Sequence, residues 1–404
     1  MKAGWQSRKL GELCSIELGK TPSRSNKAFW DQSRQTNNVW LSIADLLNAE
    51  EGLISDSKEY LSDAGAALCK VVRAGTLLVS FKLTLGRLAF AGQDLFTNEA
   101  IAALGIFDEK ELSKEFLFYF FHFYDWRKAA ENDVKLKGMT LNKAKLKEIV
   151  VSFPEPAEQQ RIVAILDEAF AGIASARAAA AQNLQNARAF FGSHLQSVFS
   201  QDGDDWLDRQ LGDIFHIGSS KRVYEKEWTS SGVPFYGGRE VVKLAMGMSP
   251  VISAAHISEE KYLELASQYD MPQAGDILMT ARGTIGVGYV VKDGDRFYYK
   301  DGNIISFRAK TPTNPWFILF AFKTKLIRDQ ITRLTGTTVK HLPIEKANAL
   351  TIKVPDLAAQ NALVEQLERI ENESKDLEAL YQRKLDALDE LKKSLLHQAF
   401  RGQL

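Results

Sequence analysis

The sequence predicts an α+β protein made of two copies of one unit, each a mixed globular domain followed by one long helix. Three observations predict this fold. Matching residues recur at a nearly constant distance along the chain, and short apolar runs broken by Gly, Pro and Asn give way to apolar residues spaced every three or four positions. The 404 residues also suffice for two buried cores. We therefore expect globular domains over 1–153 and 204–353, and helices over 154–203 and 354–404.

The internal repeat is the strongest of these signals, because missing a repeat misassigns the whole fold. Trp5, Arg8, Leu10, Gly11, Glu12, Leu13 and Ile16 recur 201 positions later as Trp206, Arg209, Leu211, Gly212, Asp213, Ile214 and Ile217. At an offset of 200, Thr84-Leu85-Gly86 corresponds to Thr284-Ile285-Gly286. Chance matches would not keep one offset along the whole chain.

Each globular domain should contain both strands and helices. Leu77–Phe81 and Ile277–Thr280 have the apolar, β-branched character of buried strands. A helix is expected near 115–128 in the first copy and near 315–334 in the second.

The two helical segments carry a continuous apolar stripe. In the first it includes Leu166, Ile173, Ala187 and Leu195, and in the second it runs from Leu363 to Ala399. A helix of about 40 residues is ~60 Å long, and alone it would leave this stripe in water. We expect the two helices to pair antiparallel, as two-fold symmetry between the copies favours, so that a coiled coil joins and separates the globular domains.

Charge and cysteine content exclude some classes of protein. The net charge is zero, but the segments 1–150 and 206–350 carry +2 and +4, whereas 151–205 and 351–404 carry −4 and −2. Cys14 and Cys69 form no CxxC pair, which argues against a disulfide scaffold. The start has no signal-peptide pattern, and the most apolar stretch, 116–124, spans only nine residues, so we expect a cytoplasmic protein without a membrane span.

Catalytic motifs are missing from the sequence. It contains no GxxxxGK[ST] loop, no GxGxxG, no GxSxG, and no Asn-Pro-Pro-Tyr or Asp-Pro-Pro-Tyr tetrapeptide. The six His have no metal-ligand spacing with Cys. We expect no catalytic residue and no metal ligand, which favours a binding protein.

Several local motifs, in order and in duplicate, resemble the specificity subunits of type I DNA restriction–modification systems, the HsdS family. They are the domain openings at Trp5 and Trp206, the turn Ala281-Arg282-Gly283-Thr284-Ile285-Gly286, and the late loop 336–342. The helix start Pro154-Glu155-Pro156-Ala157-Glu158-Gln159-Gln160 and the helix end Ser394–Phe400 agree as well. Two departures are Met139, where the second copy has Thr337, and the second helix start 355–361, which lacks the acidic residue before Gln.

The resemblance implies that each globular domain is a target recognition domain that reads one half of a two-part site in double-stranded DNA. It implies two modification (methyltransferase) subunits and restriction (motor-nuclease) subunits as partners. It further implies that S-adenosylmethionine, ATP and Mg are held by those partners, so that this chain binds no cofactor and is not an enzyme.

Loop residues with basic, amide or hydroxyl side chains are the DNA-contact candidates, because such groups bind phosphates and base edges. In the first domain the candidates are Lys20, Ser23, Arg24, Lys82, Lys137 and Thr140. In the second they are Lys221, Arg222, Arg239, Arg282, Thr338 and Lys340. Each could instead be a solvated loop residue, and the Gly-Thr loops could only shape a bulge.

Two other classes of function remain open. One is a duplicated coiled-coil scaffold that binds proteins without reading DNA. The other is a methyltransferase with degenerate motifs. Salt-dependent DNA binding separates the first of these from a DNA reader, and S-adenosylmethionine binding separates the second.

Overall fold

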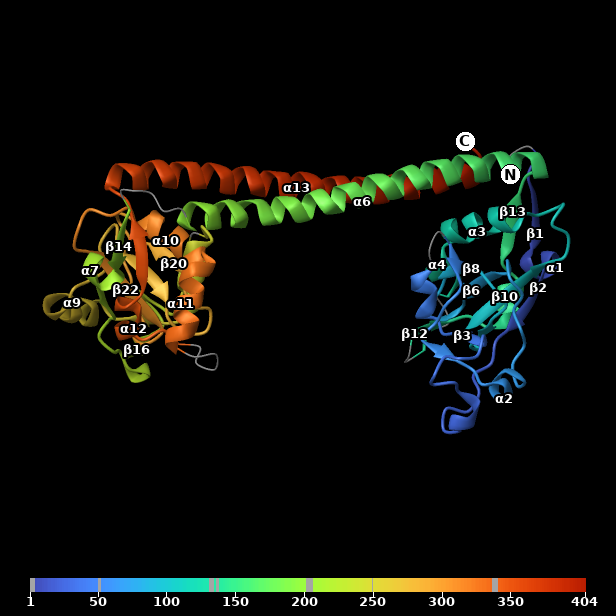
Figure 1. Ribbon diagram of the computed structural model, residues 1–404, viewed down its shortest axis with the longest axis horizontal. Helices are drawn as coiled ribbons and strands as arrows, with labels where there is room; N and C mark the ends of the chain where they lie inside the picture. Colours follow the sequence, from blue (N-terminus) through green and yellow to red (C-terminus); the bar gives the residue numbers. More distant parts are fainter. Residues whose placement is uncertain are drawn as a thin grey trace. The chain divides into compact units, whose positions relative to one another are not determined.

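The computed structural model describes residues 4–49, 52–130, 134–135, 138–200, 206–248, 250–335 and 341–404. The chain divides into two compact units (Figure 1). Unit 1 comprises Met1–Ala180 with Arg383–Leu404, and unit 2 comprises Ala181–Gln382. Each unit therefore combines one globular domain with a part of both long helices, a division that cuts across the four segments expected from the sequence.

Unit 1 is built around a five-stranded sheet of order β2-β10-β6-β8-β4. Smaller sheets of order β5-β3-β9, β11-β12-β7 and β1-β13 surround it among the described residues. The strands are β1 (Gln6–Lys9), β2 (Cys14–Leu18), β3 (Val39–Leu41), β4 (Leu53–Ile54), β5 (Glu59–Tyr60), β6 (Leu77–Ser80), β7 (Lys82–Leu83), β8 (Leu88–Ala91), β9 (Phe96–Thr97), β10 (Ile101–Ile106), β11 (Val134–Lys135), β12 (Gly138–Thr140) and β13 (Val150–Phe153). Strand β6 is buried on both faces, as its unbroken apolar run predicts.

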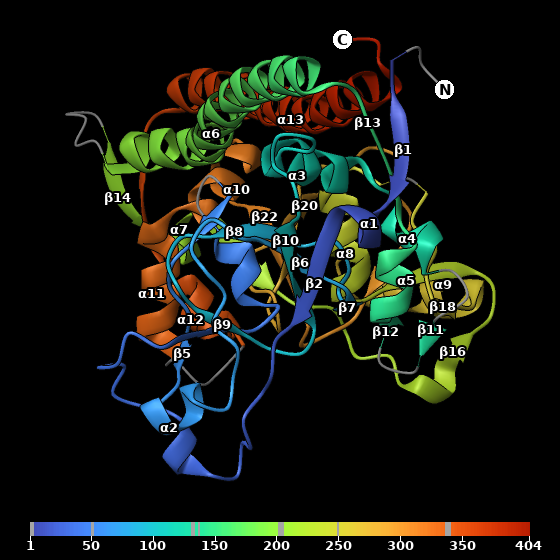
Figure 2. The ribbon, with the colours of Figure 1, turned by 90° about the vertical axis from the view of Figure 1, so that its right-hand side faces the viewer.

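Most helices of unit 1 pack on one face of this sheet, whereas α2 (Asp63–Ala66) lies apart from it beside the first 3-10 turn. The helices are α1 (Leu10–Leu13), α2, α3 (Lys114–Phe123), α4 (Trp126–Ala129), α5 (Lys143–Lys147) and the first part of α6 (Pro156–Ser200), with 3-10 turns at Lys27–Phe29 and Asp45–Asn48. The aromatic helix α3 lies between the sheet and the long helices (Figure 2). The prediction of a single helix over 115–128 was wrong, because two helices, α3 and α4, occupy this segment. Asp125 accepts hydrogen bonds from the N–H groups of Arg127 and Lys128 and so caps a second helix, α4.

Unit 2 has a similar central sheet, but its additional strands and helices differ from those of unit 1. Its sheets have the orders β15-β22-β19-β20, β16-β18-β17-β21 and β14-β23. The strands are β14 (Leu207–Gln210), β15 (Phe215–Gly218), β16 (Trp228–Thr229), β17 (Val233–Tyr236), β18 (His256–Ile257), β19 (Ile277–Thr280), β20 (Gly288–Val290), β21 (Tyr298–Tyr299), β22 (Ile304–Ala309) and β23 (Thr351–Val354). The pair β19–β22 corresponds to β6–β10, and β14–β23 corresponds to β1–β13.

The helices of unit 2 show the same kind of interruption. They are α7 (Leu211–Ile214), α8 (Gly238–Ala245), α9 (Glu259–Gln268), α10 (Pro315–Lys323), α11 (Lys325–Thr335), α12 (Ile344–Asn348) and the first part of α13 (Leu357–Arg401), with a 3-10 turn at Glu225–Glu227. The helix expected over 315–334 is divided at Thr324. Its hydroxyl donates to the carbonyl of Ala321 at 2.6 Å and accepts from the N–H of Ile327 at 3.4 Å.

The two long helices run antiparallel within each unit. In unit 2, the Ser374 hydroxyl donates to the carbonyl of Ala187 at 2.6 Å, and the side chains of Gln366 and His194 meet at 3.4 Å. In unit 1, Arg177 pairs with Asp389, and the Arg161 guanidinium donates to the carbonyl of Leu404 at 2.7 Å. As the residue number on one helix rises it falls on the other, so the predicted antiparallel pairing and the α+β class are confirmed.

The apolar stripe is buried along most of α6. Leu166, Ala180 and Leu195 are at most 2 % exposed. The stripe of α13 is less well covered, since Leu377 remains 40 % exposed and its neighbour Leu380 49 % exposed. No helix in the described ranges combines the length and the hydropathy needed to cross a membrane.

Candidate nucleic-acid interface

Each globular domain contains a turn that one hydroxyl side chain holds in place. In unit 1 the Ser80 hydroxyl, at the end of β6, donates to the carbonyl of Thr84 at 2.6 Å and accepts from the N–H of Arg87 at 2.9 Å. The N–H of Gly86 also donates to the Ser80 carbonyl at 2.9 Å. The backbone between residues 81 and 87 is thereby closed into a compact loop beside the sheet.

Thr280 performs the same task in unit 2. Its hydroxyl donates to the carbonyl of Thr284 at 2.5 Å and accepts from the N–H of Val287 at 3.1 Å. The N–H of Gly286 donates to the Thr280 carbonyl at 3.0 Å. We call 81–87 and 281–287 the pinned turns. Their equal geometry, at an offset of 200 residues, shows that the sequence repeat extends to individual hydrogen bonds.

Gly86 is required by its surroundings. Its φ is +75°, and a Cβ at this position would lie 2.4 Å from the indole ring of Trp126. The turn therefore fits closely against the core of unit 1, which fixes the residues at its tip.

The structure brings the late loop of each domain next to the pinned turn. Strand β12 pairs antiparallel with β7, so that Thr140 lies opposite Lys82 and Met139 lies opposite Leu83. In unit 2 the corresponding contact is a bridge between Arg282 and His341. Two motifs that are far apart in sequence thus form one surface in each domain. Lys137, Thr338 and Lys340 lie outside the described residues, and only the backbone of Thr140 is described.

The pinned turns present basic side chains at equivalent positions. Lys82 is half-buried and Arg282 is exposed, and neither has an ion-pair partner within 4.0 Å in the parts of the chain that the structure describes. A cation without an ion pair can bind a phosphate or a guanine edge without first breaking an ion pair. These two residues are therefore well placed for a DNA contact.

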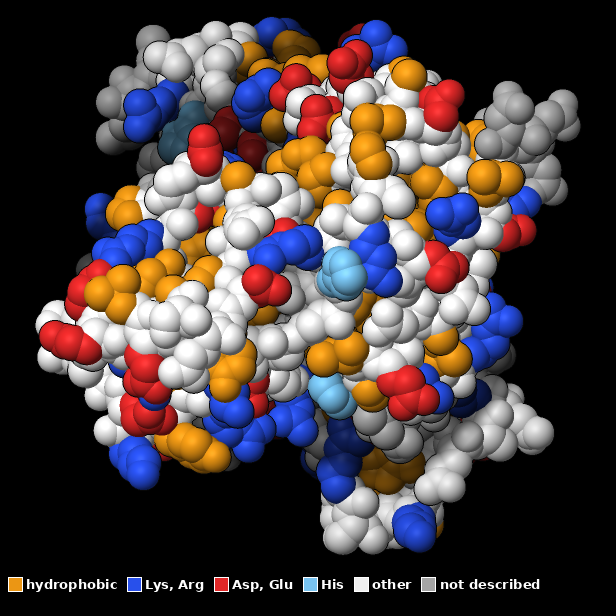
Figure 3. Space-filling view, turned by 90° about the vertical axis from the view of Figure 1, so that its left-hand side faces the viewer, with side chains coloured by type: hydrophobic (Ala, Val, Ile, Leu, Met, Phe, Trp, Pro, Cys, Tyr) orange, Lys and Arg blue, Asp and Glu red, His pale blue; other side chains and the backbone are white. Residues whose placement is uncertain are grey.

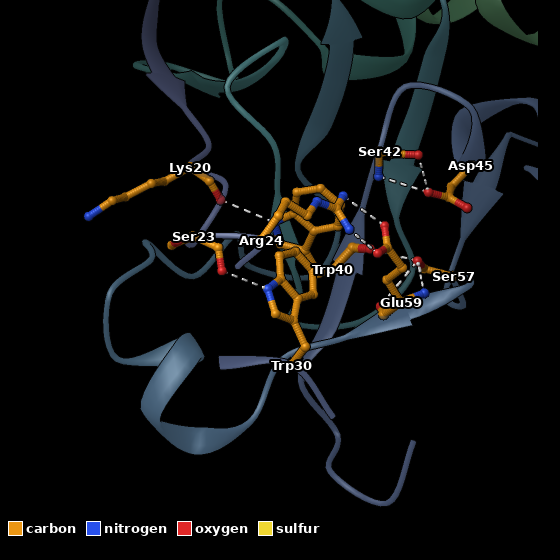
Figure 4. A network of polar contacts seen from close by, with 9 residues as sticks. All are labelled: Lys20, Ser23, Arg24, Trp30, Trp40, Ser42, Asp45, Ser57 and Glu59. Atoms are coloured by element: carbon orange, nitrogen blue, oxygen red, sulfur yellow. Dashed lines mark hydrogen bonds and ion pairs between the residues drawn. The ribbon is translucent and has the colours of Figure 1, made fainter. Parts of the chain in front are cut away.

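A second cluster in unit 1 contains Lys20, Ser23 and Arg24 (Figure 4). The guanidinium of Arg24 lies over Trp30 and Trp40, with centroid distances of 4.3 and 4.9 Å. The indole N–H of Trp30 donates to the carbonyl of Ser23 at 3.2 Å, and that of Trp40 donates to the carbonyl of Lys20 at 3.0 Å. Both tryptophans thus fix the backbone of the segment that carries the three candidates.

Arg24 itself is engaged by Glu59. Its two terminal nitrogens contact the two carboxylate oxygens, one of them at 3.0 Å. The hydrogen bonds that Arg24 donates to the Glu59 carboxylate raise the pKa of the Arg24 guanidinium. Because its planar fork is occupied, Arg24 serves here to organise the tryptophans, whereas the ammonium of Lys20 extends away from the network (Figure 4).

Arg24, Trp30 and Glu59 of this cluster line a cavity of about 390 Å³ that the sequence did not predict. Its walls include Lys27, Arg34, Lys58 and Tyr60. Arg34 lies over the ring of Tyr60 at 4.8 Å and pairs with Asp56 at 2.6 Å. The available signal was the mixture of basic and aromatic residues between positions 24 and 60, but sequence alone could not show which of them converge.

The DNA-contact candidates of the second domain also include both ion-paired residues and residues without an ion pair. Arg222 is paired with Asp301 at 2.7 Å. The ammonium of Lys221 lies 5.6 Å from the ring of Tyr269, and its backbone N–H donates to the Tyr298 hydroxyl at 2.9 Å. Arg239 is exposed on α8 and has no ion-pair partner among the described residues. Figure 3 shows a face on which Lys and Arg side chains are interspersed with Asp and Glu rather than gathered in one patch.

No group of three or more His, Cys, Asp or Glu residues that could hold a metal ion occurs in the described ranges.

Comparison with known proteins identifies the family. The family described as the type I restriction modification DNA specificity domain matches twice, over residues 2–182 and 203–385. The chain belongs to this type I specificity family. The two matches follow the internal repeat, and they confirm the resemblance on which the sequence interpretation rested.

Individual relatives of this type I specificity chain are also named as specificity subunits. The type I restriction enzyme MjaIX specificity subunit of Methanocaldococcus jannaschii is 22 % identical over 93 % of this chain and 90 % of its own length. The Haemophilus influenzae protein S.HindORF215P, named for the same function, is 28 % identical over 57 % of this chain and 58 % of its own. This chain thus matches somewhat more than half the length of that second relative.

A solved structure supports the fold of the type I specificity chain. A chain from a structure described as the basis of complex assembly and conformational transition of the type I R-M system superposes with a TM-score of 0.69. It is 18 % identical in sequence, and the match covers 100 % of this chain and 99 % of the other.

Proposed function

We propose that this chain is the sequence-reading subunit of a type I restriction–modification complex, and that each globular domain reads one half of a two-part target in double-stranded DNA. The observation that carries the proposal is the pinned turn, which occurs once in each unit and presents a basic residue, Lys82 or Arg282, beside the late loop. A duplicated reading surface suits a target with two halves.

The same proposal assigns chemistry to other subunits. Two modification subunits would hold S-adenosylmethionine and methylate adenine, and motor-nuclease subunits would use ATP and Mg. A structure with a similar fold is described as concerning complex assembly in the type I system, which supports such partners. The exposed leucines Leu377 and Leu380 of α13 also support a protein partner on the long helices. The expected site of action is the cytoplasm, where DNA is present.

A scaffold that binds only proteins is the second candidate, and the same exposed leucines favour it. The two candidates differ in their dependence on DNA. A DNA reader should bind duplex DNA with an affinity that falls steeply with salt, because phosphate contacts release counterions. A scaffold should not.

The decisive experiment is to express the chain with its modification partners and to map methylated adenines in the cellular DNA. The expected result is one motif with two specified halves separated by an unspecified gap. Replacement of residues 1–153 by the corresponding segment of another family member should change one half only. A map without a two-part motif, or a replacement that alters both halves, contradicts the proposal.

A further inference from the structure

Leu83 occupies a backbone conformation that leucine seldom adopts. Its φ is +64°, and Leu83 and Arg34 are the non-glycine residues with positive φ in the described part of the chain. The N–H of Thr84 donates to the carbonyl of Lys82 at 2.8 Å, which closes a turn of three residues around Leu83. A γ-turn with a positive φ at its centre is rare and strained, and a branched side chain adds to the strain.

The second copy shows that the fold does not need leucine here. The equivalent residue in the pinned turn of unit 2 is Gly283, with φ +78°. The pinning bonds made by Ser80 and by Thr280 are otherwise the same. Glycine adopts this conformation at little cost, so the turn would form at least as readily without the leucine side chain.

Packing does not compensate for the strain. Leu83 is 51 % exposed, whereas its neighbours Leu85 and Leu88 pack against the core of unit 1. The side chain thus contributes little to the core while it disfavours the backbone conformation. Strained residues that persist in this way cluster at binding and catalytic sites.

We propose that Leu83 is a specificity-determining residue that makes an apolar contact with a base of the half-site read by the first domain. This inference rests on the proposed function. Lys82, the residue before it, is placed for a phosphate contact, and apolar side chains recognise the methyl group of thymine in the major groove. In the second domain Gly283 has no side chain to make such a contact. The two pinned turns would therefore read different features of DNA although their backbone conformations are alike.

The test uses the full chain in complex with its modification partners. The probes are a duplex that carries the target mapped in cells and a duplex of equal length with the first half-site scrambled. The variants are Leu83→Gly, Leu83→Asn, which tolerates positive φ, and Leu83→Met, which retains an apolar side chain. Leu53→Asn is the matched control, because Leu53 lies in the same unit and is also 51 % exposed.

We expect Leu83→Gly and Leu83→Asn to unfold at a temperature no lower than the parent chain and to lose about tenfold in preference for the target duplex. Leu83→Met and Leu53→Asn should retain that preference. If the glycine and asparagine variants discriminate the two duplexes as well as the parent, the proposal for Leu83 is wrong while the DNA-reading function stands. If the parent itself shows no preference, the proposed function and this inference fail together.

Discussion

The side-chain amide of Gln159 accepts a hydrogen bond from the backbone N–H of Ser113 at 3.0 Å, and thereby ties the start of α6 to the start of α3. Gln360 makes the equivalent bond to the N–H of Asn314, at 2.9 Å, in unit 2. Each glutamine also donates to a proline carbonyl at 2.9 Å, that of Pro154 or Pro355. The residue shared by the two helix starts is thus a buried connector between the helix and the globular domain.

Replacement of Gln159 by leucine should destabilise unit 1 by about 2–3 kcal/mol. Gln159 is 1 % exposed, so leucine would deprive the half-buried N–H of Ser113 and the buried carbonyl of Pro154 of this partner. Thermal unfolding of the full chain measures the effect. Gln182→Leu is the control, because Gln182 lies exposed on the same helix and bonds only to Asn186 among the contacts described. Equal losses in both variants would show that Gln159 has no special role.

Replacement of Ser374 by leucine should destabilise the helix pair of unit 2 by about 1–3 kcal/mol. Ser374 is 3 % exposed, and its hydroxyl reaches the backbone carbonyl of Ala187 at 2.6 Å, so α13 and α6 approach closely at this point. A larger side chain must push the helices apart. Ser374→Ala removes one hydrogen bond without adding volume and should cost only about 1 kcal/mol. Chemical denaturation of both variants measures their free energies of unfolding. A leucine variant as stable as the alanine variant would contradict the prediction.

The sequence predicted the repeat and the long helices because both depend on local, regular patterns. Spacings of three and four residues identify α6 and α13 whatever they pack against, and matching residues such as Trp5 and Trp206 reveal the duplication. The breaks at Asp125 and Thr324 were missed, because one side-chain hydrogen bond at each place outweighs an apolar pattern that continues through it.

The candidate interface was predictable only in part. The basic residues of the pinned turns stood out in sequence, but their proximity to the late loops results from the pairing of β7 with β12 and the bridge at His341. The engagement of Arg24 by Glu59 joins residues 35 positions apart and gave no sequence signal. Leu83 was not a candidate, because an exposed leucine becomes notable only when its backbone angle is known.

A circular permutant should fold and remain active. The rings of Trp5 and Phe400 both pack against Phe116, with centroid distances of 6.1 and 5.2 Å, so residues near the two ends of the chain meet in the core of unit 1. A short linker from residue 404 to residue 1, with new ends opened between α6 and β14, keeps these contacts. Circular dichroism and methylation mapping check the result. A permutant opened inside β6 is the control that should fail.

Cys14 should resist alkylation in the folded chain, whereas Cys69 should react. Cys14 is 1 % exposed, and burial raises the pKa of its thiol to about 12 from an ordinary value of 9.0. At pH 9 the folded chain thus keeps Cys14 protonated, whereas the same thiol in the unfolded chain would be about half ionised. By linkage, this contribution to stability is fully present below pH 9 and decreases as the pH rises towards 12. Peptide mapping after iodoacetamide treatment tests this, and modification of Cys14 at the rate of Cys69 contradicts it.

Two arginines of unit 2 should separate DNA binding from structure. Arg282 lies in a pinned turn, exposed and without an ion pair in the described parts of the chain, whereas Arg222 is paired with Asp301. Arg282→Ala should therefore weaken binding to the target duplex by about tenfold without lowering the unfolding temperature. If Arg282 contacts a phosphate, the slope of log K against log salt should become shallower by about 0.9, and binding to a scrambled duplex should fall equally. If it reads a base edge, the slope should stay and only the target duplex should lose affinity.

Arg222→Ala, which removes an equal charge from the same unit, should leave both affinities within about twofold, because Asp301 already engages the Arg222 guanidinium at 2.7 Å. Equal effects of the two substitutions would show that binding depends on total charge rather than on the pinned turn.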